Sequence, residues 1–318
     1  MLCRGRQRDR TMAKRYPLKP LKRFDYKLVE AKLDGLLFNV DRDLQRNIRH
    51  AESTNNMEAS RCLSLLNVML RFASNSYRAV RFVLADTPEE PARKPNYALI
   101  IAPVNRQLLD LLFSLVYMLD DFPTRSLQYH RAGWREASEE YHKFKSEFSR
   151  DPEWKAFFAN FSKGLGQLAP LFRITEREKK NVKLIPYWKH PGELKDEQTS
   201  CRNFLRWLDK WLYADTSAQS HLSFGGLFMV SPFLVAELVG GQSQEIVENR
   251  MIHQYRFHQF SRTALVTLAI ATEIDCYCNL GNREVIAYLW ALFSEHAPEG
   301  KEMYGARYEE KLSSRSVA

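Results

Sequence analysis

Ser217 and His221 place a hydroxyl and an imidazole one helical turn apart in the stretch TSAQSHLSFGG. On a helix, side chains four residues apart lie on the same face and can form a hydrogen bond. A histidine in this position could transfer a proton. The G-x-S-x-G turn that exposes a nucleophilic serine in hydrolases is absent from the chain. Gly225-Gly226, which follows, has the conformational freedom to end a helix. We therefore keep His221 as a candidate catalytic residue and Ser217 as its polar neighbour, without assigning a hydrolase.

Two arginine–histidine pairs have a spacing that suits phosphodiester cleavage, Arg125 with His130 and Arg135 with His142. In ribonucleases of the helical HEPN type, such a histidine moves the proton and the arginine stabilises charge on the phosphorane. The chain has 29 arginines and 8 histidines, so chance alone produces about as many pairs. The spacing therefore supports a ribonuclease hypothesis without establishing it.

Patterns typical of metal and cofactor sites are missing. The five cysteines include no CxxC pair, and the Glu-x-x-His spacing of helical di-metal sites occurs once, where two copies are needed. The glycine pairs 225–226 and 240–241 lack the surrounding phosphate-loop and dinucleotide patterns. We predict no metal site and no cofactor.

Charged residues also interrupt apolar helix faces. Asp215 falls on a helical stripe that contains Phe204, Leu208 and Trp211. A carboxylate in such a stripe is costly unless it is paired and hydrogen-bonded. The cation could come from Arg125 or from Arg106. Asp110 follows Arg106 one helical turn later. These residues therefore predict either internal ion pairs or a ligand site.

The elements that must position these residues are helices, because apolar residues recur at three- and four-residue spacing and alternating patterns are almost absent. We predict an all-α multi-helix bundle with long loops. The segment 99–119 is apolar around most of its circumference and is predicted to be the buried central helix. The other predicted helices are 26–51, 55–84, 125–148, 152–161, 197–222, 243–275 and 281–295.

Composition divides the chain into five predicted parts. They are a basic tail at 1–24, N-terminal helices at 25–86, a proline-rich loop at 87–98, the main bundle at 99–297 and a polar C-terminal tail at 298–318. The basic tail carries nine basic groups and one acid, which leaves a net charge of +1 on the rest of the chain. We expect this tail to be disordered.

The predicted location is the cytoplasm. Scattered cysteines without a disulfide framework fit a reducing compartment. Residues 224–239 are the most apolar segment, but they are shorter than the roughly 20 residues of a membrane span and contain Pro232 and Glu237. We predict no transmembrane segment.

Four stretches resemble an uncharacterised, mostly bacterial, all-helical domain-of-unknown-function family. They are NRQLLDLLFSLVYMLDD from Asn105, TRSLQYHRAGW from Thr124, IPYWKHPG from Ile185 and WLYADTSAQSHLSFGGL from Trp211. The resemblance covers about residues 55–280. The chain departs from the family pattern at Asp110, where glutamate is commoner, and at Leu222, where proline follows the histidine. The resemblance implies a helical fold and a shared polar cluster. With the charged residues above, that cluster would contain Arg106, Asp110, Arg125, Tyr129, Asp215, Ser217 and His221.

Three functions fit these observations. The first is an intracellular binding or interaction module, linked to stress or phage defence, whose polar cluster stabilises the fold or holds a small ligand. The second is a metal-independent HEPN-like ribonuclease, with Arg125 as charge stabiliser and His130 as proton carrier. The third is a peripheral membrane-associated protein anchored by residues 1–24. The partners that we keep as alternatives are RNA, another protein and a second copy of this chain in a homodimer.

Overall fold

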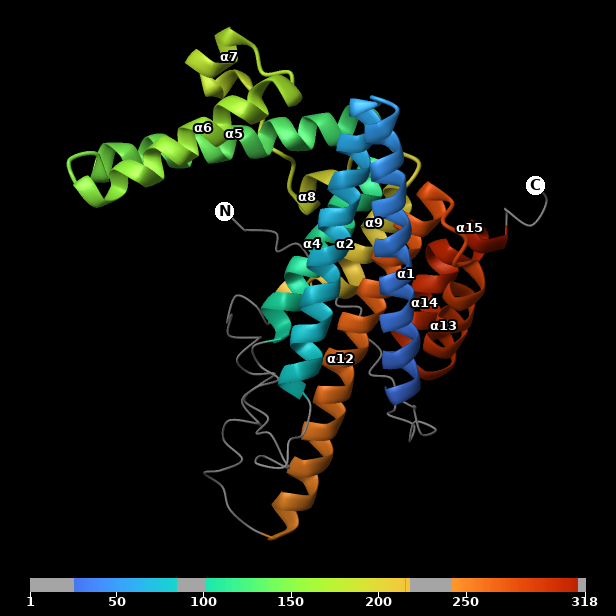
Figure 1. Ribbon diagram of the computed structural model, residues 1–318. Helices are drawn as coiled ribbons and strands as arrows, with labels where there is room; N and C mark the ends of the chain where they lie inside the picture. Colours follow the sequence, from blue (N-terminus) through green and yellow to red (C-terminus); the bar gives the residue numbers. More distant parts are fainter. Residues whose placement is uncertain (1–25, 85–100, 215, 218–241, 314–318) are drawn as a thin grey trace, which may run out of the picture.

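The computed structural model describes residues 26–84, 101–214, 216–217 and 242–313, with the backbone alone for 26 and 242–256. Every regular element within these ranges is helical and none is a strand, which confirms the predicted all-α fold (Figure 1). No helix in this part of the chain is long and apolar enough to cross a membrane. The predicted tail 1–24 and loop 87–98 lie outside the described residues.

Helices α1 (Tyr26–Ser53) and α2 (Met57–Leu84) form an antiparallel pair. The turn between them places Asn55 in the left-handed region, at a φ of 54°, which asparagine tolerates better than most residues. The next residue, Asn56, caps α2 by accepting a hydrogen bond from the backbone N–H of Ala59 at 3.1 Å. Local sequence therefore ends one helix and begins the other.

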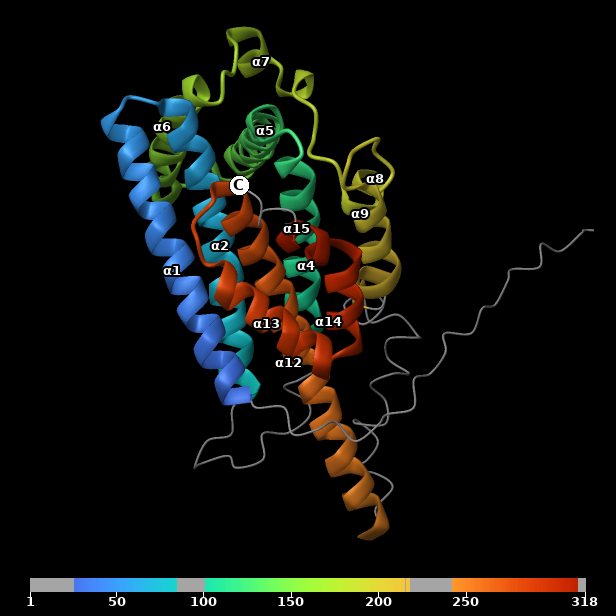
Figure 2. The ribbon, with the colours of Figure 1, turned by 90° about the vertical axis from the view of Figure 1, so that its right-hand side faces the viewer.

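Helix α12 (Gln242–Cys278) runs through the middle of the bundle (Figure 2). Helices α1, α2, α4 (Ile101–Leu119) and α13 (Arg283–His296) pack around it. Every residue from 259 to 276 is buried. Helix α4, the predicted central helix, is buried over much of its length, but α12 is enclosed more completely. Because α12 contains polar residues, its sequence does not indicate that the helix is buried at the centre of the bundle.

Those polar residues are paired inside the core. Asn105 of α4 donates to the side chain of Gln259 at 2.8 Å and accepts from the Thr263 hydroxyl at 2.7 Å. On another side of α12, the indole of Trp290 donates to Thr272 at 3.0 Å. A buried polar group is costly unless it is hydrogen-bonded. These bonds therefore favour one register of α4 and α13 against α12.

The C-terminal segment, predicted as a polar tail at 298–318, is helical as far as Ser313, the last described residue. It consists of α14 (Pro298–Met303), a π-helical turn (Tyr304–Tyr308) and α15 (Glu309–Ser313). Met303 and Tyr308 are fully buried. A Cβ atom on Gly300 would lie 2.6 Å from the Phe293 carbonyl oxygen, so glycine allows α14 to approach α13. The few apolar residues of the segment face the core and its many charged residues mostly face outward.

Two of those charged residues, Arg307 and Lys311, bind Glu273 of α12. Its side chain is fully buried, and it accepts a hydrogen bond from Arg307 Nε at 2.5 Å and another from Lys311 Nζ. Burial alone would raise the pKa of Glu273, but the nearby Lys311 and Arg307 outweigh it and hold the pKa at about 2. A buried carboxylate needs such partners. The C-terminal helices therefore cover a charge that the central helix carries.

Helices α5 (Phe122–Phe148) and α6 (Lys155–Leu171) form a hairpin that projects from the bundle (Figure 1). A short 3₁₀ turn (Pro152–Trp154) joins them, and α6 continues past the predicted end at residue 161. Helix α7 (Glu176–Lys180), which begins with a capping box from Thr175, and a second 3₁₀ turn (Val182–Leu184) follow the hairpin. We call residues 133–171 the arm.

Helices α8 (Pro191–Leu194) and α9 (Arg202–Leu208) lead into a π-helical turn (Asp209–Tyr213). A π-helical turn contains an extra residue and so changes which side chains face the core. Leu212 is 1% exposed, whereas Trp211, predicted for the core stripe, is 42% exposed. The single stripe predicted for 197–222 is therefore wrong at Trp211.

We predict that Glu273→Gln lowers the free energy of unfolding by about 3 kcal/mol, because it leaves Arg307 and Lys311 without their anion. Urea denaturation at neutral pH measures the change. Glu310→Gln is the control, since Glu310 is exposed on the same segment, and its effect should stay within about 0.5 kcal/mol. Equal stability of the two variants would contradict the structural role of Glu273.

Candidate functional site

One face of α4 carries polar side chains at nearly every turn. Arg106, Asp110 and Ser114 follow one another at four-residue intervals, so they lie on one side of the helix. Asn105, next to Arg106, instead points into the core toward α12. Side chains from the loop before α8 and from the π-helical turn after α9 meet this polar face. We call Arg106, Asp110, His190 and Tyr213 the Arg106 site.

Arg106 is held between a carboxylate and an aromatic ring. Its Nε lies 3.4 Å from both oxygens of Asp110, and its guanidinium lies 3.4 Å from the centre of the Tyr213 ring. This arrangement combines a salt bridge with a cation–π contact. The Nη1 atom of Arg106 is buried and has no hydrogen-bond partner in the part of the chain that the structure describes. The site therefore holds an unused donor on a positively charged group.

Asp110 lies where the site meets solvent, with 42% of its side chain exposed. Burial raises the pKa of Asp110, and the lowering effects of Arg106 and of His190 only partly offset it. A carboxyl with a raised pKa accepts a proton more readily than an ordinary aspartate. Asp110 can thus offer either an acceptor or, when protonated, a donor.

Arg125 and Tyr129 lie toward the other end of α4. Arg125 donates to the Tyr117 carbonyl oxygen at 2.6 Å and to Asp120 at 3.2 Å. Trp188 packs edge-on against Tyr117 and Tyr129, with ring centres 5.7 and 5.0 Å away, respectively. Arg125 thus ties the start of α5 to the end of α4. Its contacts account for it as a structural residue.

Trp188 connects the two ends of this face. Its indole N–H donates to Ser114 Oγ at 3.1 Å, between Arg106 and Tyr117 along α4. The predicted cluster is therefore divided: Arg106 with Asp110 at one end, and Arg125 with Tyr129 at the other. Ser217 is half-buried, while Asp215 and His221 lie outside the described residues.

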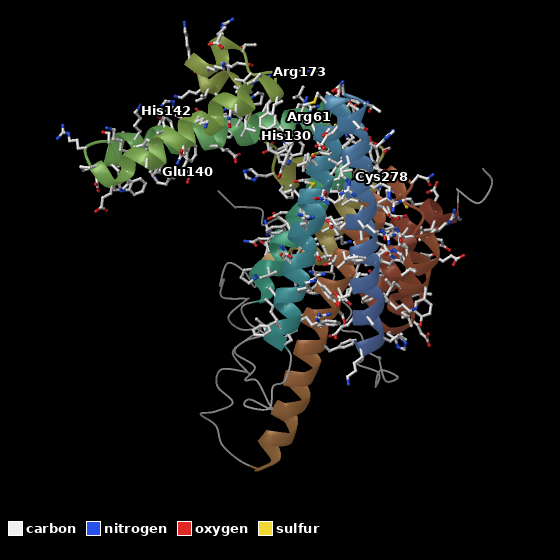
Figure 3. The ribbon with its side chains drawn as sticks, in the orientation of Figure 1. Arg61, His130, Glu140, His142, Arg173 and Cys278 are labelled. Atoms are coloured by element: carbon white, nitrogen blue, oxygen red, sulfur yellow. The ribbon has the colours of Figure 1, made fainter. Side chains whose placement is uncertain are left out.

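The geometry does not favour the Arg125–His130 pair as a catalytic unit. Residues five apart on a helix point about 140° apart. His130 stacks on Phe172 with ring centres 4.6 Å apart, at the base of the arm (Figure 3). Burial, together with the charge of Arg61, lowers the pKa of His130 to about 4. Its imidazole is therefore neutral near pH 7, and its contacts are those of a packed core residue.

The second arginine–histidine pair is also divided. Arg135 is buried, donates to Glu139 at 2.9 Å and to the Ile185 carbonyl oxygen at 2.5 Å, and stacks on Tyr187. His142 is exposed farther out on the arm (Figure 3). Arg135 therefore holds the loop at 185–187 against α5.

His190 and Tyr213 are the site residues that the sequence did not single out. Both lie in stretches that carried the family resemblance, IPYWKHPG and WLYADTSAQSHLSFGGL. Their aromatic and polar character was the available signal, but nothing local indicates that either residue meets α4. Among the described residues, no group of three His, Cys, Asp or Glu side chains is placed to hold a metal ion.

We predict that Asp110→Asn is at least as stable as the wild type at pH 7. A carboxyl whose folded pKa is raised loses stability as the pH rises through that pKa, so the advantage of the variant should shrink as the pH falls toward 3.8. Melting temperatures of both proteins between pH 7 and pH 3.8 test whether the advantage of the variant shrinks. The control is Asp196→Asn, because a hydrogen bond from Arg206 lowers the pKa of Asp196 and reverses the trend. A strongly destabilised Asp110→Asn would show that the Arg106 ion pair dominates.

We predict that His130→Phe reduces the acid sensitivity of the fold. A histidine with a lowered folded pKa stabilises the protein above its ordinary pKa of 6.5, and this contribution disappears as the pH falls toward about 4. Phenylalanine keeps the stacking on Phe172 but cannot be protonated. The melting temperature should therefore drop less between pH 7 and pH 5 in the variant than in the wild type. His142→Phe, on the exposed part of the arm, should behave as the wild type does. An unchanged profile in His130→Phe would exclude His130 as the titrating group.

Comparison with known proteins identifies no relative. No family model matches this chain, and neither a curated protein nor a solved structure matches it. The resemblance to the helical family of unknown function therefore stays a prediction, and inferences about function rest on the geometry of the sites.

Proposed function

We propose that this chain is a helical binding module whose Arg106 site holds a small ligand with a carboxylate or phosphate group. The observation that carries the proposal is the buried Nη1 atom of Arg106, which has no acceptor among the described residues. Buried donors are nearly always satisfied in folded proteins. An acceptor supplied by a ligand is the simplest way to satisfy this one.

The chemistry of the site favours an oxyanion. A guanidinium presents paired N–H groups that match the two oxygens of a carboxylate or phosphate. Asp110 occupies the Nε side at 3.4 Å, which is longer than the usual range for a charge-assisted hydrogen bond. Arg106 therefore keeps capacity for a second anion.

Tyr213 and His190 surround Arg106 on its solvent side. The Tyr213 ring stacks on the guanidinium and fixes its plane. His190, near Asp110, is exposed and can approach a ligand from solvent.

The other hypotheses have less support. Arg125 is bonded to Tyr117 and Asp120, and His130 stacks on Phe172, so the pair adds no support for RNA cleavage beyond its spacing. The tail on which membrane attachment depended lies outside the described residues. A cytoplasmic location, a role in stress or defence, a protein or RNA partner and a homodimer stay predictions.

We predict that inorganic phosphate or benzoate raises the melting temperature of the wild type and not that of Arg106→Gln. A ligand at ten times its Kd stabilises the folded state by about 1.4 kcal/mol. Differential scanning fluorimetry over a ligand titration measures the shift, and calorimetry then gives the Kd.

Two further variants make this test specific. Arg46→Gln changes an arginine whose side chain is 68% exposed on α1 and should leave the ligand response intact. Tyr213→Leu removes the ring that stacks on Arg106 but keeps the arginine, so it should weaken the ligand response. It provides the test if Arg106→Gln does not fold. An equal response in all folded variants would place the anion elsewhere, and no response to either probe would contradict an oxyanion site.

A further inference from the structure

The arm is a two-helix hairpin, and no other described segment packs against one of its sides. On the opposite side, Ile185 packs with Trp134 of α5 and Ala169 of α6, and Tyr187 donates to Glu139 at 2.6 Å. Figure 1 shows the arm extending well away from α1, α2 and α12. The bundle therefore does not cover the distal part of the arm.

Helix α6 carries two neighbouring apolar stripes. The first consists of Phe158, Leu165 and Ala169, and it faces α5 and the segment that contains Ile174 and Ile185. The second consists of Phe157, Phe161, Gly164, Leu168 and Leu171. In this second stripe, which we call the outer stripe, Phe157 is 39%, Leu168 40% and Leu171 48% exposed.

The spacing of the outer stripe is that of a helix seam. Its positions alternate four and three residues apart, the interval at which apolar residues meet a neighbouring helix in a coiled coil. A helix normally needs one apolar face to pack on its bundle, and α6 already uses its first stripe for that purpose. The outer stripe is thus suited to a further helix.

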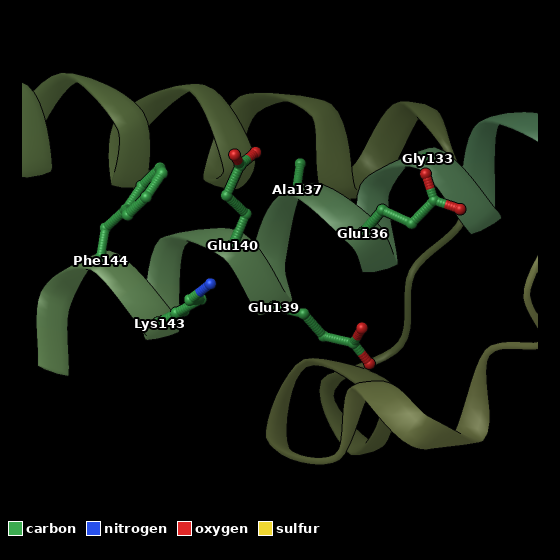
Figure 4. Close-up of a pocket in the computed structure, with 7 residues that line it drawn as sticks. All are labelled: Gly133, Glu136, Ala137, Glu139, Glu140, Lys143 and Phe144. Carbon is green, nitrogen blue, oxygen red and sulfur yellow. The ribbon is translucent and has the colours of Figure 1, made fainter. Parts of the chain in front are cut away.

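The outer stripe continues onto α5. Phe144 of α5 lies 6.4 Å from Phe157 between ring centres, and Tyr141 stacks at 5.6 Å on Phe161. Figure 4 shows Ala137, Glu140 and Phe144 on the side of α5 next to α6. These residues line an open hollow of about 600 Å³ together with Gly133, Glu136, Glu139 and Lys143. All the residues that line the hollow belong to α5, and Phe144 among them contacts Phe157 of the outer stripe. We call the hollow and the outer stripe together the arm groove.

Two glycines lie in the arm groove. Gly133 lies within α5 and Gly164 within α6, where glycine destabilises a helix relative to alanine. A Cβ atom at either position would meet nothing within 4 Å. No described segment approaches either glycine, so both positions leave room for another backbone to approach closely.

The rim of the arm groove is acidic. Glu136 and Glu140 are exposed, and neither forms an ion pair with another described side chain. Glu139, by contrast, is bonded to Arg135 and Tyr187. Lys143 is the single cation that lines the hollow. A bound helix with lysine or arginine beside its apolar seam would complement this rim.

We propose that the arm groove docks an amphipathic helix with a basic flank, supplied by a partner protein, to complete a three-helix bundle. The apolar seam of the partner would pack on Phe157, Phe161 and Leu168. Its basic flank would lie along Glu136 and Glu140. Such helix-in-groove binding uses anchors at the spacing that the outer stripe presents.

The test is fluorescence anisotropy with the full chain and a labelled peptide of leucine–lysine heptads, with leucine at a and d and lysine at e and g. We expect a Kd in the micromolar range that rises about tenfold in Glu136→Lys/Glu140→Lys and in Leu168→Ser/Leu171→Ser. Phe38→Ser, a change at a side chain 63% exposed on α1, should leave the Kd unchanged. A matched peptide with glutamate in place of lysine should not bind.

Several results would overturn the proposal. These are no binding of the lysine peptide, equal binding of both peptides, or a Kd that neither arm variant changes. Light scattering tests the alternative occupants. A dimer that Leu168→Ser/Leu171→Ser dissociates would assign the arm groove to a second copy of the chain. Peptide binding that requires deletion of residues 1–24 would assign it to the chain's own tail.

Discussion

The buried carboxylate of Glu273 constrains the C-terminal half of this fold. It lies on α12, around which α1, α2, α4 and α13 pack, and its side chain is fully buried. Arg307 and Lys311 must therefore reach it from the C-terminal helices, and they hold its pKa at about 2 against the effect of burial. Tyr308, between those two cations, is buried beside Trp290, with ring centres 4.4 Å apart. Charge pairing and apolar packing thus require the same position of the last helices.

The enclosed helix α12 also determines how the Arg106 site is presented. Asn105 is bonded to Gln259 and Thr263 in the core, which fixes the rotation of α4 about its axis. Arg106, one residue later, is then turned toward Tyr213, and Asp110 and Ser114 follow on the same side. The site is therefore a consequence of satisfying polar groups in the core. This link explains why an arginine occurs within an otherwise apolar helix.

The arm differs from the bundle in how it is stabilised. Its distal half is held by rings that contact one another, including Phe148 stacked on Trp154 at 4.5 Å. Ala169 is the one fully buried residue of α6. A hairpin of two helices has too few neighbours to enclose its apolar side chains. The Arg106 site and the arm groove thus lie on different parts of the molecule, and the ligands that we propose for them differ in size: a small anion on α4 and a helix on the arm.

The sequence by itself determined the helical class and the approximate extents of α1, α2, α4 and α5, because three- and four-residue periodicity is a local property of the chain. It also identified Arg106 with Asp110, since residues one turn apart on a helix lie side by side. Only the tertiary structure decided that α12 occupies the centre, that a π-helical turn moves Trp211 outward, and that Arg307 and Lys311 belong to Glu273. It likewise brought Tyr213 to Arg106 and Phe172 to His130. The physical reason is that the partner of a buried charge or ring comes from a distant segment, whereas periodicity reports only which residues share a face.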